Sequence, residues 1–141
     1  MNADGVGLYN PTTNSFSMVD ISATITTDYK FFGGALAPNG LVIFAPFDAT
    51  GVGVFDPKSN AFSLIDISSS VPGTTGSVKF GGAVAAPGGL IVMEPHNAAG
   101  IGLFDPITLS FSLIGISATV NTNAKFAGAA VSPNGLIVMA P

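Results

Sequence analysis

Apolar residues along the chain occur in short runs that are separated by turn residues. The run GVGVFD (51–56) is rich in β-forming residues. The sequence DPKSN (56–60) then predicts a turn, because Pro fixes φ and Asp can accept a backbone hydrogen bond. The next run, AFSLIDI (61–67), alternates with a period of two and is partly apolar on both faces, which is typical of a strand packed between sheets. No segment keeps a helical period, so the pattern predicts an all-β protein.

A second pair of strands follows a polar loop. The run FGGAVAA (80–86) consists mainly of small residues, which suit a place where backbones lie close together. It leads through Pro-Gly-Gly at 87–89, or through Pro-Asn-Gly at 38–40 and 133–135, into an apolar run such as LIVM (90–93). Asn-Gly between two apolar runs is a strong hairpin signal, so the two runs are predicted to pair, with the apolar one at the centre of a sheet.

This pattern of four strands occurs three times. The motif G-[VI]-G-[LV]-[FY]-[DN]-P recurs at 5–11, 51–57 and 100–106. The chain is therefore expected to be a single domain of three repeats, with bounds 1–46, 47–95 and 96–141. Four strands in a repeat of 46 or 49 residues match the size of a β-propeller blade. The additional residues of the longer repeat fall in the loop 68–78.

The order of these elements resembles the kelch repeat. The resemblance lies in GGALAPNGLVIF (33–44) followed by VGVFDPKSNAF (52–62), and it recurs over all 141 residues. It implies a blade of four strands, A to D, in which A lines the axis of a propeller and D is outermost. The family's Gly-Gly doublet after strand B is absent, and phenylalanine stands where the family usually has tryptophan, at Phe16, Phe62 and Phe111. The repeat is therefore kelch-like, and no kelch partner is carried over.

The lettered strands follow the order CD-ABCD-ABCD-AB, so each end of the chain carries half a blade. Three blades are fewer than the roughly four to eight that propellers use, whereas two chains would supply six. Open sheet edges also favour pairing with another copy. We therefore expect a head-to-tail homodimer with twofold symmetry, in which each of two composite blades takes A and B from one subunit and C and D from the other. The alternative is a threefold monomer, a β-trefoil or a β-prism.

The composition narrows the classes of partner. The chain is 48% apolar and 9% charged, with a net charge of −4 and four basic residues, all lysine, which argues against nucleic acid as a partner. No apolar run approaches the roughly 20 residues of a membrane helix, so no membrane partner is expected. No secretory signal is visible, which leaves the compartment open, with the cytoplasm as the default. The absence of cysteine excludes disulfides and cysteine-ligated metals, and no cofactor is expected.

Lys30, Lys79 and Lys125 each stand immediately before the first strand of a blade. In a propeller this position lies at the mouth of the axial channel, so the lysines of two chains would form a ring that attracts an anion or an acidic partner. In the structural alternative, each lysine pairs with Asp20 or Asp66, or bonds loop carbonyls, and so holds the blade together. The structural role is favoured, and the three lysines are kept as candidate ligand-binding residues.

Glu94 and His96 are the sole glutamate and the sole histidine, and both break the repeat near the loop that joins strands B and C. They are candidate acid and base groups or the start of a metal site. No second histidine and no cysteine can complete such a site, so no metal is expected. Asp48 and Asn97 lie in the equivalent loops and are candidates for a polar ligand pocket. The alternative for all four is repeat variation on a solvated loop, where Asx residues favour turns.

Neither of two common catalytic motifs is present. No serine stands in a G-x-S-x-G context, and the glycine-rich GVGVFD leads into a strand rather than a helix, which excludes a phosphate loop. The expected function is a non-enzymatic β-propeller module that assembles into a ring and binds a small molecule, a glycan or a protein on its loop face. One alternative is a propeller hydrolase or lyase that uses Glu94 and His96. Another is a lectin-like carbohydrate binder built as the threefold monomer.

Overall fold

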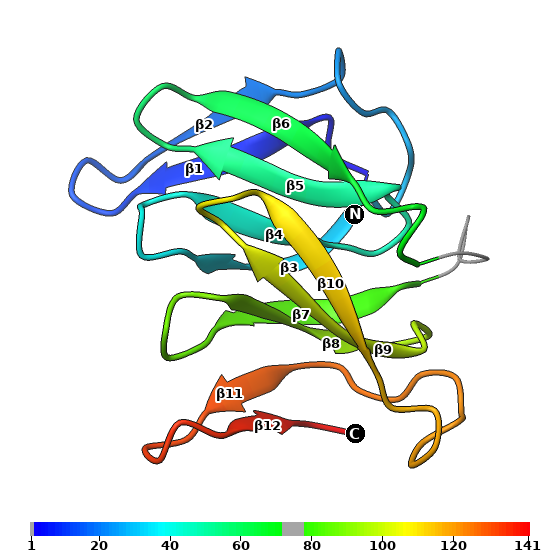
Figure 1. Cartoon of the computed structure of the whole chain (residues 1–141). Helices are drawn as coiled ribbons and strands as arrows, with labels where there is room; N and C mark the ends of the chain where they lie inside the picture. The colour runs from blue at the N-terminus through cyan, green and yellow to red at the C-terminus, as the bar shows by residue number, and fades with distance from the viewer. Residues whose placement is uncertain (1, 72–77) are drawn as a thin grey trace.

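The computed structural model describes residues 2–71 and 78–141, and every regular element within them is a β-strand (Figure 1). The strands are β1 (Gly5–Asn10), β2 (Ser15–Asp20), β3 (Phe31–Leu36), β4 (Val42–Pro46), β5 (Gly51–Asp56), β6 (Ala61–Asp66), β7 (Phe80–Ala85), β8 (Ile91–Pro95), β9 (Gly100–Asp105), β10 (Ser110–Gly115), β11 (Ala129–Val131) and β12 (Ile137–Met139). The all-β expectation is confirmed. In the described residues there is no helix that could cross a membrane. Residues 72–77 of the loop expected at 68–78 lie outside the described part.

The strands form antiparallel sheets of four and of two. The four-stranded sheets are β3-β4-β5-β6 and β7-β8-β9-β10, and the two-stranded sheets are β1-β2 and β11-β12. Neighbouring strands in each sheet are consecutive in sequence, so each sheet is a simple meander. β8 is buried at every residue, in agreement with the central position predicted for the apolar run. The described residues thus form two four-stranded sheets, flanked at each end by a two-stranded sheet.

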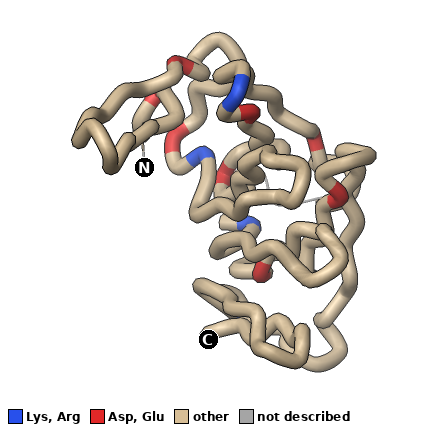
Figure 2. The backbone as a smooth tube through the Cα atoms, turned by 90° about the vertical axis from the view of Figure 1, so that its left-hand side faces the viewer, with Lys and Arg blue, Asp and Glu red and all other residues tan. Residues whose placement is uncertain are grey.

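The sheets follow one another along an arc. The β1–β2 hairpin lies at one end of this arc and the β11–β12 hairpin at the other, so the two hairpins do not meet (Figure 1, Figure 2). Within the arc β3 lies beside β7, and β7 lies beside β11. A Cβ on Gly81 would lie 2.6 Å from the carbonyl oxygen of Phe126, which no side chain could tolerate. The predicted crowding of backbones at the small-residue strands is therefore confirmed.

The turn between β5 and β6 is closed by the side chain of Asp56. Its Oδ1 accepts a hydrogen bond from the backbone N–H of Lys58 at 2.8 Å, as the Asp-Pro turn sequence predicts. The last turn residue has a left-handed backbone conformation in all three repeats, with φ of 50° at Asn14, 57° at Asn60 and 54° at Leu109. Asparagine tolerates this conformation well, whereas leucine does so at a steric cost.

The main core lies between the two four-stranded sheets. Its largest buried members are Ile43, Val52, Ile67, Phe80, Ile91, Met93 and Phe104. A smaller cluster joins the β1–β2 hairpin to the next sheet. In it, Ile21, Ile25 and Ala49 are buried, and Val6 and Phe31 pack against them. Burial of one large apolar side chain stabilises a fold by roughly 1.5–3 kcal/mol, so this cluster holds the hairpin at its end of the arc.

Candidate functional site

The three repeated lysines are interior groups. The exposed fractions of Lys30, Lys79 and Lys125 are 3%, 3% and 8%. Their Nζ atoms donate hydrogen bonds to the carbonyl oxygens of Ala3, Asp48 and Ala98 at 3.3, 3.3 and 3.1 Å, respectively. Each bond joins the start of one sheet to a loop of the preceding sheet. The lysines therefore have the structural role that was predicted as the alternative, in which each one bonds a loop carbonyl. They do not form an exposed ring.

The predicted pairing of these lysines with Asp20 or Asp66 does not occur in the described residues. Both carboxylates instead accept hydrogen bonds from the next loop, from the backbone N–H of Ser22 at 2.8 Å and of Ser68 at 2.9 Å. The first of these bonds is the main reason why the pKa of Asp20 is lowered. Backbone N–H groups of the next loop therefore bind the two carboxylates that were predicted to pair with the lysines.

The main chain of Lys79 reinforces the junction between the two four-stranded sheets. Its N–H donates to the carbonyl oxygen of Phe47 at 2.9 Å. Its carbonyl oxygen accepts from the N–H groups of His96 and Ala98 at 2.9 and 3.1 Å. Lys125 N–H donates in the same way to the carbonyl oxygen of His96 at 3.0 Å. These bonds fix the loops that contain Asp48, His96 and Asn97 relative to one another.

Opposite charges influence each other at Asp48 and Lys79, and Lys30 Nζ lies 3.5 Å from Oδ1 of the exposed Asp4. Burial lowers the pKa of Lys79, and the negative charge of Asp48 offsets part of this effect. The Oδ1 atom of Asp48 is buried and has no hydrogen-bond partner in the described residues. A buried carboxylate oxygen without a partner is uncommon, because removing it from water costs free energy that no bond returns.

Glu94 lies inside β8, with an exposed fraction of 1%. The expectation that it lies on a solvated loop is therefore wrong, since β8 extends past the apolar run to Pro95. Burial raises the pKa of its carboxyl group, and hydrogen bonds from the N–H groups of Glu94 and Gly128 lower it in part. Its Oε1 occupies the space that a side chain at Gly82 would need, and its Oε2 is buried with no partner in the described residues. Glu94 thus reaches past β7 toward β11.

His96 lies half-buried in the loop after β8, next to Asn97. Its Nδ1 is 3.2 Å from Oδ1 of Asn97, and the same oxygen accepts a hydrogen bond from the N–H of Ala124 at 2.9 Å. No hydrogen bond or ion pair joins His96 to Glu94 in the described part of the chain. The structure therefore brings His96 to Asn97 and Asp48 to Lys79, and it directs Glu94 elsewhere. The described residues also contain no group of three His, Cys, Asp or Glu side chains able to hold a metal.

Sequence reasoning missed the aromatic side chains beside His96. The ring centroid of Phe47 lies 6.2 Å from that of His96, 5.6 Å from that of Phe32 and 6.5 Å from that of Tyr29. Phe32 and Tyr29 are 40% and 48% exposed. We call Tyr29, Phe32, Phe47 and His96 the aromatic cluster. The signal that could have found it is the repeat itself, because the residues equivalent to Phe32 are Gly81 and Ala127.

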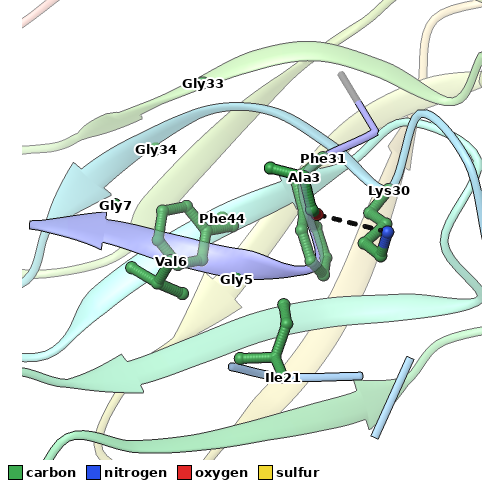
Figure 3. A pocket seen from close by; sticks show the side chains of 10 residues that line it. All are labelled: Ala3, Gly5, Val6, Gly7, Ile21, Lys30, Phe31, Gly33, Gly34 and Phe44. Atoms are coloured by element: carbon green, nitrogen blue, oxygen red, sulfur yellow. Dashed lines mark hydrogen bonds between the residues drawn. The ribbon is translucent and has the colours of Figure 1, made fainter. Parts of the chain in front are cut away.

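The two ends of the arc expose apolar side chains of a kind that the complete sheets bury. Phe16 and Met18 of β2 are 71% and 54% exposed. At the other end Val138 of β12 is 58% exposed, whereas its repeat equivalent Val92 of β8 is 6% exposed. A recess of about 440 Å³ lies between β1 and the sheet β3–β6, with the Lys30 to Ala3 bond at its side (Figure 3).

Antiparallel four-stranded sheets that follow one another along an arc define a β-propeller-like fold. The chain is similar to the crystal structure of selenomethionine-substituted virginiamycin B lyase from Staphylococcus aureus, a β-propeller, with a TM-score of 0.67 at 13% sequence identity. The match covers 100% of this chain and 50% of the lyase chain, so this chain spans about half of that protein. No protein-family model matches the chain, and no curated protein matches it.

This likeness changes two expectations. The β-propeller is the fold found, rather than the β-trefoil or β-prism of the alternative, while the kelch-like type of the blade stays a prediction. The expectation of a non-enzymatic protein is wrong, since an enzyme has the same fold over the whole length of this chain. At 13% identity the likeness gives the fold alone, so residues that carry out chemistry must be argued from this chain.

Proposed function

We propose that the chain is one half of a β-propeller and that two copies join head to tail into a closed ring of six four-stranded sheets. In this ring β11 and β12 of one copy complete the sheet that β1 and β2 of the other begin. The loops with the aromatic cluster then gather on one face, where a ligand or a substrate can bind. The chain functions as a self-assembling ring whose loop face is the working surface.

The observation that carries this proposal is the exposure of one aromatic position. Tyr9 of β1 is 61% exposed, whereas its equivalents Phe55 of β5 and Phe104 of β9 are 1% and 0% exposed. In the four-stranded sheets these positions lie on strands that are paired on both sides, and Phe104 also packs in the core between the two sheets, whereas β1 pairs with β2 alone among the described residues. An unpaired edge next to an exposed apolar face is unfavourable in water, and the addition of two strands removes both costs.

A second copy is the occupant that the two ends favour. The hairpin β1–β2 corresponds to the third and fourth strands of a complete sheet, and the hairpin β11–β12 corresponds to the first and second strands. Together the two hairpins supply the four strands of one sheet. Both ends lie on the same chain but at opposite ends of the arc, and one copy therefore cannot satisfy itself in this conformation (Figure 1). The match to half of a propeller chain of greater length supports the same conclusion.

The mass in solution tests the ring. Native mass spectrometry and light scattering on the purified chain are expected to give a single species of about twice 14.1 kDa. A single species of 14.1 kDa would contradict the proposal. A broad series of larger masses would contradict closure, because open head-to-tail contacts grow into filaments.

Two matched variants locate the contact. Val138→Lys places a charge on the open strand β12 and is expected to convert the dimer to a folded monomer, because edge lysines oppose strand pairing. Ile107→Lys replaces another exposed apolar residue, 82% exposed and away from both ends, and is expected to leave the dimer intact. Equal effects of the two variants would mean that general surface charge, and not the seam, controls assembly.

A second candidate function is acid–base catalysis of the lyase or hydrolase class. The raised pKa of Glu94 and the lowered pKa of Lys79 both move toward neutral pH, and such groups cluster at functional sites. His96 is the ionisable candidate that is half-buried beside exposed aromatic side chains, so it is the group placed to take a proton from a bound substrate. Glu94 would act at the junction of β7 and β11. The shared fold with a lyase is the reason to test this class.

Virginiamycin B is the probe that the structural neighbour supplies. The purified dimer is incubated with it, and the product is followed by mass spectrometry. If the proposal holds, turnover is lost in His96→Ala and reduced in Glu94→Gln, while Lys58→Ala retains it because Lys58 lies in an exposed turn. No turnover by the unmodified chain would exclude this substrate class, and equal turnover by His96→Ala would exclude His96.

A further inference from the structure

In both four-stranded sheets a phenylalanine of the first strand covers a glycine of the third. A Cβ on Gly53 of β5 would lie 2.9 Å from the ring of Phe31 of β3. A Cβ on Gly102 of β9 would lie 3.0 Å from the ring of Phe80 of β7. The glycine is therefore needed at this position, because any side chain would displace the ring above it.

The same phenylalanine meets an aromatic residue of the fourth strand. Phe31 and Phe62 are arranged edge to face, with ring centroids 5.9 Å apart. Phe80 and Phe111 repeat the arrangement at 6.0 Å. Such pairs add about 0.5–1.5 kcal/mol beyond the area that they bury. Each complete sheet thus holds a set of three side-chain positions, namely the covering phenylalanine, the glycine and the edge-to-face partner.

The β1–β2 hairpin contains two of these three positions. Gly7 is the glycine and Phe16 is the edge-to-face partner, but a Cβ on Gly7 would meet no atom of the described residues within 4 Å except the ring of Phe16, at 3.1 Å. Side chains alternate between the two faces of a strand, so this position faces away from the next sheet, together with the exposed Phe16, whereas Val6 packs toward that sheet with Phe31. The recess of about 440 Å³, whose lining includes Val6, Phe31 and Phe44, lies on the Val6 side of the same open strand (Figure 3). The covering phenylalanine is the missing member.

The opposite end of the chain contains the missing member. Phe126 follows Lys125 just as Phe31 follows Lys30 and Phe80 follows Lys79. No aromatic ring contacts Phe126 in the part of the chain that the structure describes. Among the described residues the sheet β11–β12 consists of two strands, so no third strand places a glycine beneath this side chain.

The complete sheets also provide a register for the joint. β8 pairs with β9 through Ile91↔Phe104, Val92↔Leu103 and Met93↔Gly102, and β4 pairs with β5 in the same way. The equivalent residues at the two open ends give one register. It is Ile137↔Tyr9, Val138↔Leu8 and Met139↔Gly7.

We propose that Phe126 of a second copy covers Gly7 and pairs edge to face with Phe16, and that β12 of that copy joins β1 in this register. This inference rests on the proposed two-copy ring and adds the residues and the register of its joint. A backbone bond is expected beside it. Ala49 N–H donates to the carbonyl oxygen of Lys30 at 3.2 Å, and Ala98 N–H to that of Lys79 at 3.1 Å. Ala3 N–H of one copy should donate likewise to Lys125 of the other.

The absence of cysteine makes a cross-linking test specific. The double variants Leu8→Cys with Val138→Cys, and Tyr9→Cys with Ile137→Cys, each place two thiols at one predicted pair of positions. Side chains directly opposite each other in antiparallel strands have Cβ atoms about 4.5–5.5 Å apart, and adjacent pairs alternate in spacing, so one of the two should oxidise readily. The two thiols of one chain lie at opposite ends of the arc and can bond only between copies (Figure 1).

The expected result is a covalent dimer on a non-reducing gel, without a ladder of higher masses. The matched control is Leu8→Cys with Ile137→Cys, in which a shift of one residue places the thiols on opposite faces of the sheet. A dimeric mass without a cross-link in either predicted pair, or with an equal cross-link in the control, would overturn this register and leave the ring standing. A monomeric mass for the unmodified chain would refute the ring itself.

A glycine substitution tests the seating of Phe126 separately. Gly7→Ala adds a methyl group where the ring of Phe126 is expected and should raise the Kd of the dimer by about tenfold or more, because overpacked contacts are costly. Gly115→Ala is the control, since a Cβ there would meet no atom of the described residues within 4 Å. Circular dichroism should show that both variants remain folded, so that a change in Kd reports on assembly. An unchanged Kd for Gly7→Ala would overturn the seating of Phe126.

Discussion

The Nζ atom of Lys79 donates a hydrogen bond to the carbonyl oxygen of Asp48 at 3.3 Å, and this bond joins the sheet β7–β10 to the loop that follows β4. The lysine is 3% exposed, so its charge is held in the junction and not offered to a ligand. The carboxylate of Asp48, whose Oδ1 atom is buried, is the charge that offsets part of the cost of burying the lysine. Stability of the chain and its variants must be compared at a fixed chain concentration, because assembly contributes to apparent stability.

Replacement of Lys79 by methionine should lower the free energy of unfolding at neutral pH. The change leaves the carbonyl of Asp48 without its donor and the carboxylate of Asp48 without its opposite charge, which together should cost about 1–3 kcal/mol in urea unfolding. Lys58→Met is the control, because Lys58 lies in an exposed turn, and it should change stability by less than about 0.5 kcal/mol. Equal losses in the two variants would contradict a specific role for Lys79.

The same lysine should give stability a characteristic dependence on pH. Burial lowers the pKa of Lys79 in the folded chain. In the window between this lowered pKa and the ordinary lysine pKa, the unfolded chain binds more protons than the folded one, so stability should rise with pH. Urea unfolding across this alkaline range should show that rise, and the rise should be smaller in Lys79→Met. A parallel profile for the variant would show that other groups are responsible.

Glu94 should make the free energy of unfolding fall as pH rises from acidic values. Burial raises the pKa of its carboxyl group, so its contribution to stability is present below the ordinary glutamate pKa and is lost as pH rises through the raised value. Glu94→Gln should therefore be more stable than the unmodified chain at neutral pH, by on the order of 1 kcal/mol, and should lack this loss. The measurement is chemical unfolding between acidic and neutral pH.

Asp56 provides an internal contrast to Glu94. The hydrogen bond from the backbone N–H of Lys58 is the main cause that lowers the pKa of Asp56, so its contribution is present above the ordinary aspartate pKa and is lost as pH falls. Asp56→Asn should change the acidic profile in the sense opposite to Glu94→Gln. If both variants shift the profile in the same sense, the assignment of the Glu94 effect to burial is wrong.

A turn substitution should stabilise the chain. Leu109 has a φ of 54° at the position where the other two repeats have Asn14 and Asn60. Leu109→Asn should raise the free energy of unfolding by about 1 kcal/mol, because asparagine adopts this conformation at lower steric cost. Asn60→Leu should lower it by a similar amount. Thermal unfolding of the two variants checks the prediction, which fails if both substitutions shift stability in the same direction.

Substitution of a buried phenylalanine should cost more stability than substitution of an exposed one. Phe80 is fully buried and packs edge to face on Phe111, so Phe80→Ala should cost about 3–5 kcal/mol. Phe32 of the aromatic cluster is 40% exposed, and Phe32→Ala should cost markedly less. If the Phe80 variant fails to fold, Phe80→Leu gives the same comparison with a smaller loss. Equal costs for Phe32 and Phe80 would contradict the burial assigned to them.

Local signals predicted the strands and turns well. The Asp-Pro sequence at Asp56 and the apolar run in β8 produced the elements expected of them, because turn chemistry and continuous burial depend on neighbouring residues. The repeat likewise indicated that the same four strands recur. These features depend on residues that are close together in the sequence, so a single sequence is enough to predict them.

The candidate site could be predicted only in part, because its groups depend on where sheets meet. Sequence placed Lys30, Lys79 and Lys125 correctly before the first strand of a sheet, but it could not choose between a carboxylate and a loop carbonyl as the partner. Glu94 was misplaced because β8 extends past its apolar run to Pro95, which puts the carboxyl inside the sheet. A strand boundary that differs by two residues thus decided between a solvated acid and a buried one.

The glycines of the first strands have a consequence for the size of the circle. Successive sheets converge at β3, β7 and β11, where a Cβ on Gly33 would already touch the Cα of Gly82 at 3.4 Å and one on Gly81 would overlap Phe126. Side chains there would wedge the sheets apart, reduce the angle between neighbours and lower the curvature of the arc. More sheets would then be needed to complete a full turn. The glycines of the first strands thus limit the number of sheets that a closed ring requires.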